Sequence, residues 1–293
     1  RLAIEESVNI AFQREMIASR LDAVVTDLLF LSRQNELRAL IDGNGSAEPL
    51  TQWIAREYLA FCREKRVYDQ VRFIDAEGVE VVRVNFNGGN PYAVEAGELQ
   101  RKADRYYFKD TIGLGPGEVF VSPFDLNIEN GELELPLKPM IRFGVPVFDS
   151  SGEKKGIVIL NYLGETLIAA MREMAGSARG RVMLVNGDGY WLSGPEPEDE
   201  WGFMIPARAD RRFSTRHPEA WRDISASDRS RYERDAAAAV RAGLNAFRIH
   251  VHVENDAFYE ICDRRGIAVI QDSDLNWVFP TDEAFAKRAV AVF

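Results

Sequence analysis

The chain has 293 residues, of which 46% are hydrophobic and 28% are charged, a composition typical of a folded protein with room for two domains. Its net charge of -10 opposes binding to nucleic acid and to anionic membrane surfaces. No apolar run approaches the roughly 20 residues that cross a bilayer, and residues 1–6 lack the apolar segment of a signal peptide. We expect the chain as given to be soluble, with any membrane segment flanking it.

The first 42 residues contain neither glycine nor proline, and Ile10, Ile17, Val24 and Leu31 recur at intervals of seven. This pattern predicts one long amphipathic helix that runs to about residue 42 and makes up the N-terminal segment, residues 1–45. Its apolar stripe either pairs with a second copy of the chain, giving a homodimer, or packs along the flank of its own domain. A second helix is predicted over residues 50–66.

A recurring unit then follows, in which a short strand leads into a four-residue turn that begins with Asp or Asn and ends with Gly. An Asp or Asn side chain can bond the turn backbone and Gly tolerates positive φ, so each unit predicts a hairpin. The three strand-plus-turn units are residues 71–78, 145–152 and 182–189. The first and third units follow helical segments, which suggests a duplicated α+β module. Further strands are expected at residues 118–122, 138–143 and 156–162.

Several of these segments resemble the double Cache sensor region of bacterial membrane receptors, in particular the extracytoplasmic sensor of histidine kinases. The segments that carry the resemblance are residues 68–72, 83–85, 122–127, 138–142 and 160–162. The resemblance implies an α+β fold in which a long N-terminal helix precedes two PAS-like antiparallel-sheet modules. It implies a membrane-distal ligand-binding module at residues 46–166 and an incomplete membrane-proximal module at residues 167–228. A periplasmic location, in an inner-membrane receptor of a two-component system, also follows from it.

Polar residues set among aromatic ones are the candidates for binding a small molecule. These are Arg105, Tyr106, Tyr107, Ser122, Asp125 and Arg142. An Arg with an Asp can clamp a zwitterion or a carboxylate through charge-assisted hydrogen bonds. The alternative is that Arg105 pairs with Asp104 or Asp110 on the surface, while Tyr106 and Phe108 belong to the core. No cofactor is expected.

The pattern changes near Asp228, where an alanine-rich helix at residues 234–243 precedes a strand, a helix and a second strand at 245–251, 256–264 and 267–271. Alternating α and β elements predict parallel strands. Residues 229–293 resemble a barrel fragment of family 2 glycoside hydrolases of the mannosidase and galactosidase kind. The chain ends before the catalytic glutamates of that family, and its only Asn-Glu pair is Asn35-Glu36, so we expect no glycosidase activity. The tail is either a plain fusion or a source of strands that complete the second module's sheet.

Other chemistry finds little support in the sequence. His250, His252 and Glu254 alternate along a predicted strand and match zinc preferences in type, but strand-end polar residues of barrel folds usually contact substrate, and no metal site is predicted. His217, the one histidine before the tail, is assigned no catalytic role. We predict a non-catalytic sensor, and the rival hypothesis is a glycoside hydrolase fragment. Cys62 and Cys262 are expected to be small buried hydrophobic residues.

Overall fold

The computed structural model describes residues 2–129, 131–174, 182–241, 243–249 and 256–271. It divides into two compact units, one formed by Arg1–Asn186 with Trp191–Asp210 and the other by Gly187–Tyr190 with Arg211–Phe293.

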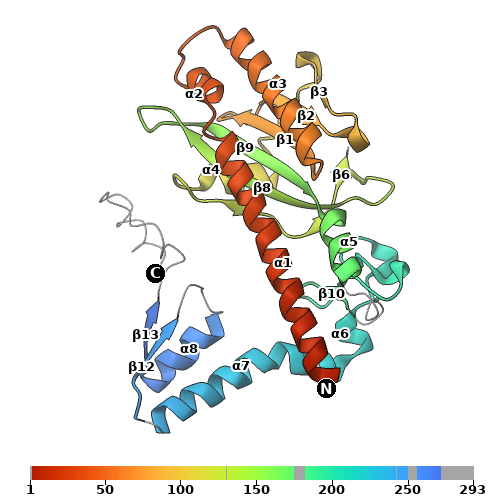
Figure 1. Cartoon of the computed structure of the whole chain (residues 1–293), viewed down its shortest axis with the longest axis vertical. Helices are drawn as coiled ribbons and strands as arrows, with labels where there is room; N and C mark the ends of the chain where they lie inside the picture. The colour runs from red at the N-terminus through yellow and green to blue at the C-terminus, as the bar shows by residue number, and fades with distance from the viewer. Residues whose placement is uncertain (1, 130, 175–181, 242, 250–255, 272–293) are drawn as a thin grey trace. The chain divides into compact units, whose positions relative to one another are not determined.

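The first unit is built on an antiparallel sheet (Figure 1) with the strand order β3-β2-β1-β9-β8-β4, and β5 pairs with β8. Its strands are β1 (Tyr68–Asp75), β2 (Glu80–Asn85), β3 (Tyr92–Ala93), β4 (Phe120–Val121), β5 (Asp125–Leu126), β8 (Pro139–Phe148) and β9 (Lys154–Leu163). The first two predicted hairpins are confirmed as β1–β2 and β8–β9. The segment predicted as a strand at residues 118–122 is shortened to the two residues of β4.

The hairpin turns form for the reason expected from their residue types. The carboxylate of Asp75 accepts a hydrogen bond of 2.7 Å from the backbone of Val79, and that of Asp149 accepts bonds of 2.9 Å from the backbones of Ser151 and Glu153. The closing residues Gly78 and Gly152 have φ values of 80° and 85°, which suit glycine.

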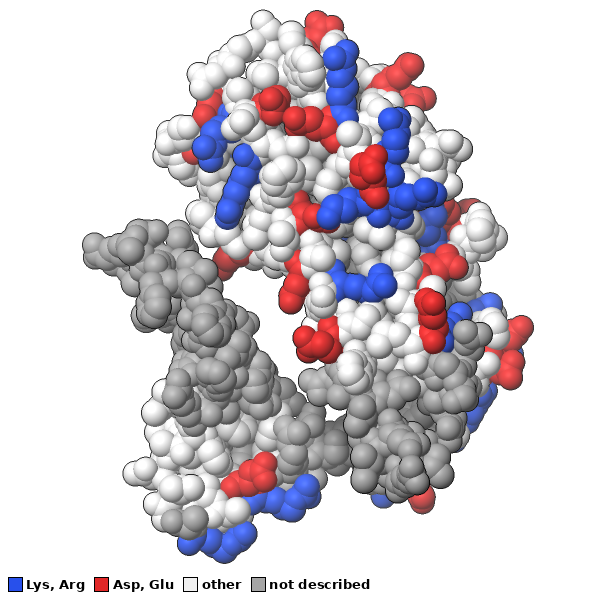
Figure 2. All heavy atoms as spheres, in the orientation of Figure 1, with Lys and Arg blue, Asp and Glu red and all other residues white. Residues whose placement is uncertain are grey.

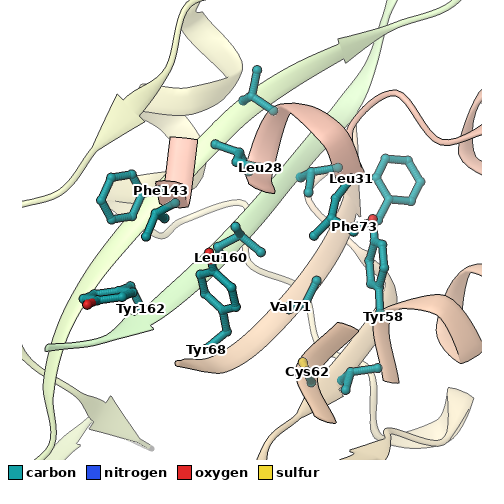
Figure 3. Packing of buried hydrophobic residues seen from close by; sticks show 14 of the residues in the cluster. Leu28, Leu31, Tyr58, Cys62, Tyr68, Val71, Phe73, Phe143, Leu160 and Tyr162 are labelled. Carbon is teal, nitrogen blue, oxygen red and sulfur yellow. The ribbon is translucent and has the colours of Figure 1, made fainter. Parts of the chain in front are cut away.

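Helices α1 (Leu2–Leu31), α2 (Asn35–Ile41) and α3 (Ala47–Lys65) bury their apolar faces against one face of this sheet. Figure 3 shows Leu28 and Leu31 of α1, with Tyr58 and Cys62 of α3, packed around apolar side chains of the strands. The core residues from the strands include Val71, Phe73, Phe143, Val158 and Leu160, all nearly inaccessible to solvent. Alternate residues of β1, β8 and β9 therefore belong to a continuous core on the helix side of the sheet.

The prediction of one uninterrupted helix to residue 42 is wrong. α1 ends at Leu31, Gln34 adopts an extended conformation with φ -60° and ψ 145°, and α2 then begins. The Ser32 hydroxyl donates to the Leu29 carbonyl at 2.9 Å, and Leu37 of α2 is fully buried in the core. A local side-chain bond and burial of Leu37 thus break the helix without glycine or proline.

The opposite face of the sheet is covered by α4 (Tyr106–Gly113), a helix that the sequence analysis did not predict. Tyr107 and Phe108 of α4 form a second apolar cluster with Ile74, Ile157 and Ile159 of the sheet. A small separate hairpin of β6 (Ile128–Glu129) and β7 (Glu132–Leu133) follows β5. This hairpin and α4 flank the polar part of the same face.

The remainder of the first unit holds α5 (Gly164–Met174) and the third predicted hairpin, confirmed as β10 (Leu184–Val185) and β11 (Trp191–Ser193). A third apolar cluster joins Leu126, Ile168, Leu192 and Trp201. Three-residue 3-10 helices occur at Asn87–Gly89, Ala96–Glu98, Pro197–Asp199 and Pro206–Arg208.

The second unit contains α6 (Phe213–Arg216), α7 (Pro218–Arg241), β12 (Ala246–Ile249), α8 (Asp256–Arg265) and β13 (Ala268–Gln271). The alternating pattern is confirmed, because β12 and β13 pair in parallel on either side of α8. Tyr232 and Ala236 of α7 pack with Phe258 and Ile261 of α8. A barrel architecture for this tail stays a prediction.

Helix α7 runs continuously across Asp228, where the sequence pattern changes, and its first residue is proline, as suits a helix start. Among the described strands, β12–β13 and β10–β11 are separate two-stranded sheets. The module boundary at residue 228 and the hypothesis that the tail completes the second module's sheet both stay predictions. The weak metal candidates His250, His252 and Glu254 lie outside the described residues.

Candidate ligand-binding site

A cavity of about 180 Å³ lies within the first unit, on the face of the sheet opposite α1 and α3. Strands β1, β2, β8 and β9, the segment before α4 and the β6–β7 hairpin all contribute to its wall. The lining residues are Gln70, Arg72, Arg83, Gln100, Lys102, Arg105, Tyr107, Asn127, Ile128, Glu129, Gly131, Arg142 and Asn161. Almost every one of them is polar or charged.

The strand period of two explains how these polar side chains reach one place. On β1, Gln70 and Arg72 alternate with the core residues Val71 and Phe73. In the register of the sheet, Gln70 pairs with Asn161, Arg72 with Arg83 and Arg142 with Asn161. Four neighbouring strands therefore present a polar strip on the face that lacks the α1–α3 core.

Arg142 is held rigidly at one end of this strip. Its guanidinium donates hydrogen bonds to the Asp125 carboxylate at 2.7 Å, to the Asn127 side-chain oxygen at 2.9 Å and to the Tyr106 hydroxyl at 3.3 Å. The Arg142 backbone N–H donates to the Ser122 hydroxyl at 2.8 Å. Burial tends to lower the pKa of Arg142, but Asp125, Tyr106 and Tyr107 together outweigh it and the pKa is raised, so this side chain stays cationic.

Arg72 and Arg83 share a single buried carboxylate. Glu80 lies 3.6 Å from the Arg72 guanidinium and 2.8 Å from that of Arg83, and its side chain is inaccessible to solvent. Arg72 also donates to the Asn161 side-chain oxygen at 2.7 Å. Among the described residues, nevertheless, the buried Nε groups of Arg72 and Arg83 have no hydrogen-bond partner, an arrangement that costs free energy unless a further acceptor is supplied.

Tyr107 stands at the centre of the positive charge. The guanidinium carbons of Arg72, Arg105 and Arg142 lie 5.1, 5.9 and 5.9 Å from its ring centroid, within the range of cation–π attraction. Burial tends to raise the pKa of Tyr107, but Arg72, Lys102 and Arg105 outweigh it and the pKa is lowered. A buried phenol whose pKa falls reports a strongly positive local potential.

The charge of the cavity wall is unbalanced. In the part of the chain that the structure describes, Lys102 and Arg105 have no carboxylate within ion-pair distance. The one acidic side chain in the lining itself is Glu129, at an exposed position of the β6–β7 hairpin. Over the visible face of the first unit, by contrast, basic and acidic side chains lie close together (Figure 2).

The six residues predicted as ligand contacts divide into two groups. Arg105, Tyr107 and Arg142 line the cavity. Tyr106, Ser122 and Asp125 do not line it, but all three bond Arg142 and hold it in position. The alternative reading of Phe108 as a core residue is confirmed, whereas Tyr106 is 39% exposed and no described ion pair joins Arg105 to Asp104 or Asp110.

Ten lining residues were not predicted as ligand contacts from the sequence, namely Gln70, Arg72, Arg83, Gln100, Lys102, Asn127, Ile128, Glu129, Gly131 and Asn161. A signal for three of them was present. Arg72, Arg83 and Asn161 are polar residues flanked on both sides by core residues of their strands, a pattern that marks the second face of a sheet as polar. Lys102 and Gln100 come from a loop and carry no such signal.

No cluster of potential metal ligands occurs among the described residues. The helices of the same residues include none with both the length and the apolar character that a bilayer crossing requires.

Comparison with known proteins agrees with the fold. No curated protein matches the chain. Among solved structures, a domain assigned to a sensory box/GGDEF family protein of Vibrio parahaemolyticus matches with a TM-score of 0.64 and 23% identity, covering 73% of this chain and 79% of that one. The extracellular domain assigned to a histidine kinase, vpHK1S-Z8, matches with a TM-score of 0.63 and 23% identity, covering 73% of this chain and 75% of that one. At this identity the likeness establishes the fold.

The family model for the sensor domain of bacterial histidine kinases matches residues 15–252. The match extends beyond Asp228 into the α7–β12 region, and no comparison supports a relation of residues 229–293 to glycoside hydrolases. Because the match spans most of the sequence and the sheet has the predicted antiparallel order, the chain belongs to the family of bacterial histidine kinase sensor domains.

Proposed function

We propose that this sensor domain is an extracytoplasmic receptor module that binds a small anionic molecule in the cavity on the α4 side of the sheet. The proposal rests on the composition of the cavity wall. Five basic side chains line it, and among the described residues the buried Nε groups of Arg72 and Arg83 have no hydrogen-bond partner. A solvated surface would satisfy these groups with water, whereas a partly enclosed site rewards a charged ligand. The sensor module has no catalytic role in this proposal.

Binding would be communicated through β1, which carries cavity residues on one face and core residues on the other. Gln70 and Arg72 line the cavity, while the Tyr68 hydroxyl of the same strand donates to Asp27 of α1 at 2.6 Å. Lys65 of α3 pairs with the same carboxylate at 2.7 Å. A ligand with different affinities for two positions of β1 would thereby bias the position of α1, and in a parent histidine kinase this bias would reach the output domain.

The proposed organisation follows the sequence analysis, with a distal ligand-binding module at residues 46–166 and a proximal module from residue 167. Dimerisation through the N-terminal helix stays a prediction. Phe12 and Phe30 of α1, each 65% exposed, are compatible with it because large apolar side chains on one helix are commonly covered by a partner. Membrane attachment is proposed only through segments that flank this chain.

Thermal unfolding of the full chain in the presence of small carboxylates, amino acids and neutral sugars tests the proposal. We expect stabilisation by acidic compounds and its loss in Arg105→Ala, since Arg105 lines the cavity without an ion-pair partner and its removal should leave the fold intact. Arg101→Ala is the matched control, because Arg101 is exposed four residues away and does not line the cavity. Failure of every compound to stabilise the chain, or equal loss in both variants, would overturn the proposal.

We also infer that residues 229–293 confer no glycosidase activity. Glycoside hydrolysis needs two carboxylates on opposite sides of the scissile bond, and the only Asn-Glu pair of the chain, the motif of the acid/base glutamate in the resembled family, is Asn35-Glu36, outside this tail. Turnover of an aryl mannoside or galactoside by the purified chain would contradict this inference.

A further inference from the structure

We propose that the ligand of this cavity is a small dianion, such as a dicarboxylate or a phosphate monoester, and not an amino-acid zwitterion or a monoanion. The proposal rests on the proposed function and names the chemical class of the ligand that the same site takes.

The side chains in and around the cavity wall carry more positive than negative charge. Five basic side chains line it, from Arg72, Arg83, Lys102, Arg105 and Arg142. Three carboxylates offset them, since Glu80 pairs with Arg72 and Arg83, Asp125 pairs with Arg142 and Glu129 lies in the wall. Five positive and three negative charges leave a net charge of two, which a doubly charged anion neutralises. A monoanion leaves one positive charge uncompensated in a region of reduced dielectric constant.

A zwitterion finds no suitable partner for its ammonium group. Glu80 is fully buried between Arg72 and Arg83, and Asp125 is occupied by Arg142 at 2.7 Å and by the Tyr106 hydroxyl at 3.2 Å. Glu129, the remaining acid of the wall, is exposed to solvent. An ammonium would therefore be placed among the guanidiniums of Arg72, Arg105 and Arg142, which surround Tyr107, and like charges at such distances repel.

The cavity is also built to receive acceptor oxygens. Arg72 is 3% exposed, and its Nε group lacks a hydrogen-bond partner although three sides of the guanidinium are otherwise engaged by Tyr107, Asn161 and Glu80. Planar guanidiniums bind carboxylates and phosphates through paired hydrogen bonds. The side-chain amides of Gln70, Gln100 and Asn127 add donors and acceptors for hydroxyl or carbonyl groups of the ligand.

The size of the cavity restricts the ligand further. A volume of about 180 Å³ lies below the range of sites for drug-sized molecules, and Ile128 is the one aliphatic side chain in its wall. The ligand is accordingly short and hydrophilic, with its two charges close to each other.

Isothermal titration of the full chain with ligands matched in shape but not in charge tests the proposal. The probes are linear dicarboxylates from malonate to adipate, the monoamide of each, 4-aminobutyrate as a zwitterion, and glycerol phosphate. We expect the best diacid or glycerol phosphate to bind at least about tenfold more tightly than any monoamide or zwitterion, because a charge-assisted bond to a partly buried group is lost in each of the latter. The relative affinity for the diacids and for glycerol phosphate shows whether the site prefers a dicarboxylate or a phosphate monoester.

A second experiment uses variants of Lys102 and Arg105, the two lining cations that have no carboxylate partner among the described residues. Arg105→Ala and Lys102→Gln each lower the net charge of the wall by one and are expected to weaken the diacid by a larger factor than its monoamide. Arg101→Ala, an exposed cation outside the lining, should affect neither. Equal losses for diacid and monoamide in Arg105→Ala and Lys102→Gln would contradict the charge-balance argument even if binding is retained.

The outcomes separate this inference from the proposed function. Tighter binding of a monoamide or of 4-aminobutyrate than of every dianion, still abolished by Arg105→Ala, would overturn the dianion and leave the sensor site in place. Absence of binding by any probe and by the wider panel of acids, amino acids and sugars would overturn both.

Discussion

Arg72 donates a hydrogen bond of 3.0 Å to the phenol oxygen of Tyr107, while its guanidinium carbon lies 5.1 Å from the centroid of the same ring. The bond joins the central strand β1 to helix α4 across the cavity. Since Arg105 and Arg142 also lie within 6 Å of this ring, the ionisation state of one phenol controls the charge that a ligand meets. The cavity thus contains a single tyrosine through which pH can act on affinity.

Affinity for an anionic ligand is expected to fall as the pH rises towards 10. Burial tends to raise the pKa of Tyr107, but Arg72, Lys102 and Arg105 outweigh it, so the pKa lies below its ordinary value of 10.0. Below that pKa the phenol is neutral, and above it a phenolate adds one negative charge beside the ligand. The decline therefore begins below pH 10, and titration calorimetry between pH 7 and pH 10 measures it.

The matched control is Tyr107→Phe, which keeps the ring and removes the ionising group. Its affinity for an anionic ligand at pH 7 should be retained or increased, because the Arg72 donor that bonded the phenol becomes available to the ligand, and its pH profile should be flatter. Tyr106 does not compensate, since burial raises its pKa despite the opposing effect of Arg142. An unchanged pH profile in Tyr107→Phe would show that the Tyr107 phenol does not cause the decline.

Asp125 is expected to position Arg142 and not to bind the ligand directly. Asp125→Asn should lower the free energy of unfolding by about 1–3 kcal/mol, because the buried guanidinium loses its charged partner. Affinity for a dianion should be retained or increased, since the substitution raises the net charge of the wall. Urea unfolding and calorimetry on the same sample measure the two effects.

A different result for Asp125→Asn would support the hypothesis, made from the sequence, that an Arg and an Asp together bind a zwitterion. If Asp125 accepted a hydrogen bond from a ligand ammonium, Asp125→Asn would weaken zwitterion binding at unchanged diacid affinity. Ser122→Ala serves as a comparison, because the Ser122 hydroxyl accepts from the Arg142 backbone and carries no charge.

The strands and turns of the sheet were largely predictable because their signals are local. The turns at residues 75–78 and 149–152 form two hairpins because the Asp side chain bonds the turn backbone and the closing Gly adopts a positive φ. Both effects depend only on residues in or next to the turn. The break after Leu31 and the start of α7 at Pro218 were not predictable in the same way. The break depends on burial of Leu37 against distant strands, and the apparent change of pattern at Asp228 obscured a helix that continues across it.

The cavity was predictable only in part. Arg105, Tyr107 and Arg142 were found because aromatic and basic residues lie together near them in sequence. Arg72 and Arg83 were not, because they meet only through the register between β1 and β2, and Asp125 was assigned to the ligand because its pairing with Arg142 across 17 positions is set by the β5–β8 contact. A sequence shows which residues are charged, whereas the residue that pairs with each charge is determined by the tertiary structure.

Both cysteines are expected to be unreactive in the folded chain. Cys62 and Cys262 are fully buried. Burial, assisted by Asp69, raises the pKa of Cys62 to about 12, and burial, assisted by Asp263, raises that of Cys262. Because the thiolate is the reactive species, a chromogenic disulfide reagent at pH 8 should detect no thiol in the native chain and both thiols in urea. Rapid native reaction, traced with Cys62→Ser or Cys262→Ser, would show that the corresponding core opens.

Gly144 of β8 is expected to set the distance between the sheet and α4, and therefore the position of Tyr107. A Cβ at this position would lie 2.5 Å from the Thr111 hydroxyl oxygen and 3.1 Å from Ile159, and Thr111 is fully buried with its hydroxyl bonded to the Tyr107 carbonyl at 2.6 Å. Gly144→Ala should therefore push α4 outward, at a cost of about 1–3 kcal/mol in the free energy of unfolding, and weaken ligand binding. Gly97→Ala is the control, since a Cβ there meets no atom within 4 Å. Urea unfolding and calorimetry check both effects, and a Gly144→Ala chain as stable and as tightly binding as Gly97→Ala would show that α4 does not depend on this close contact.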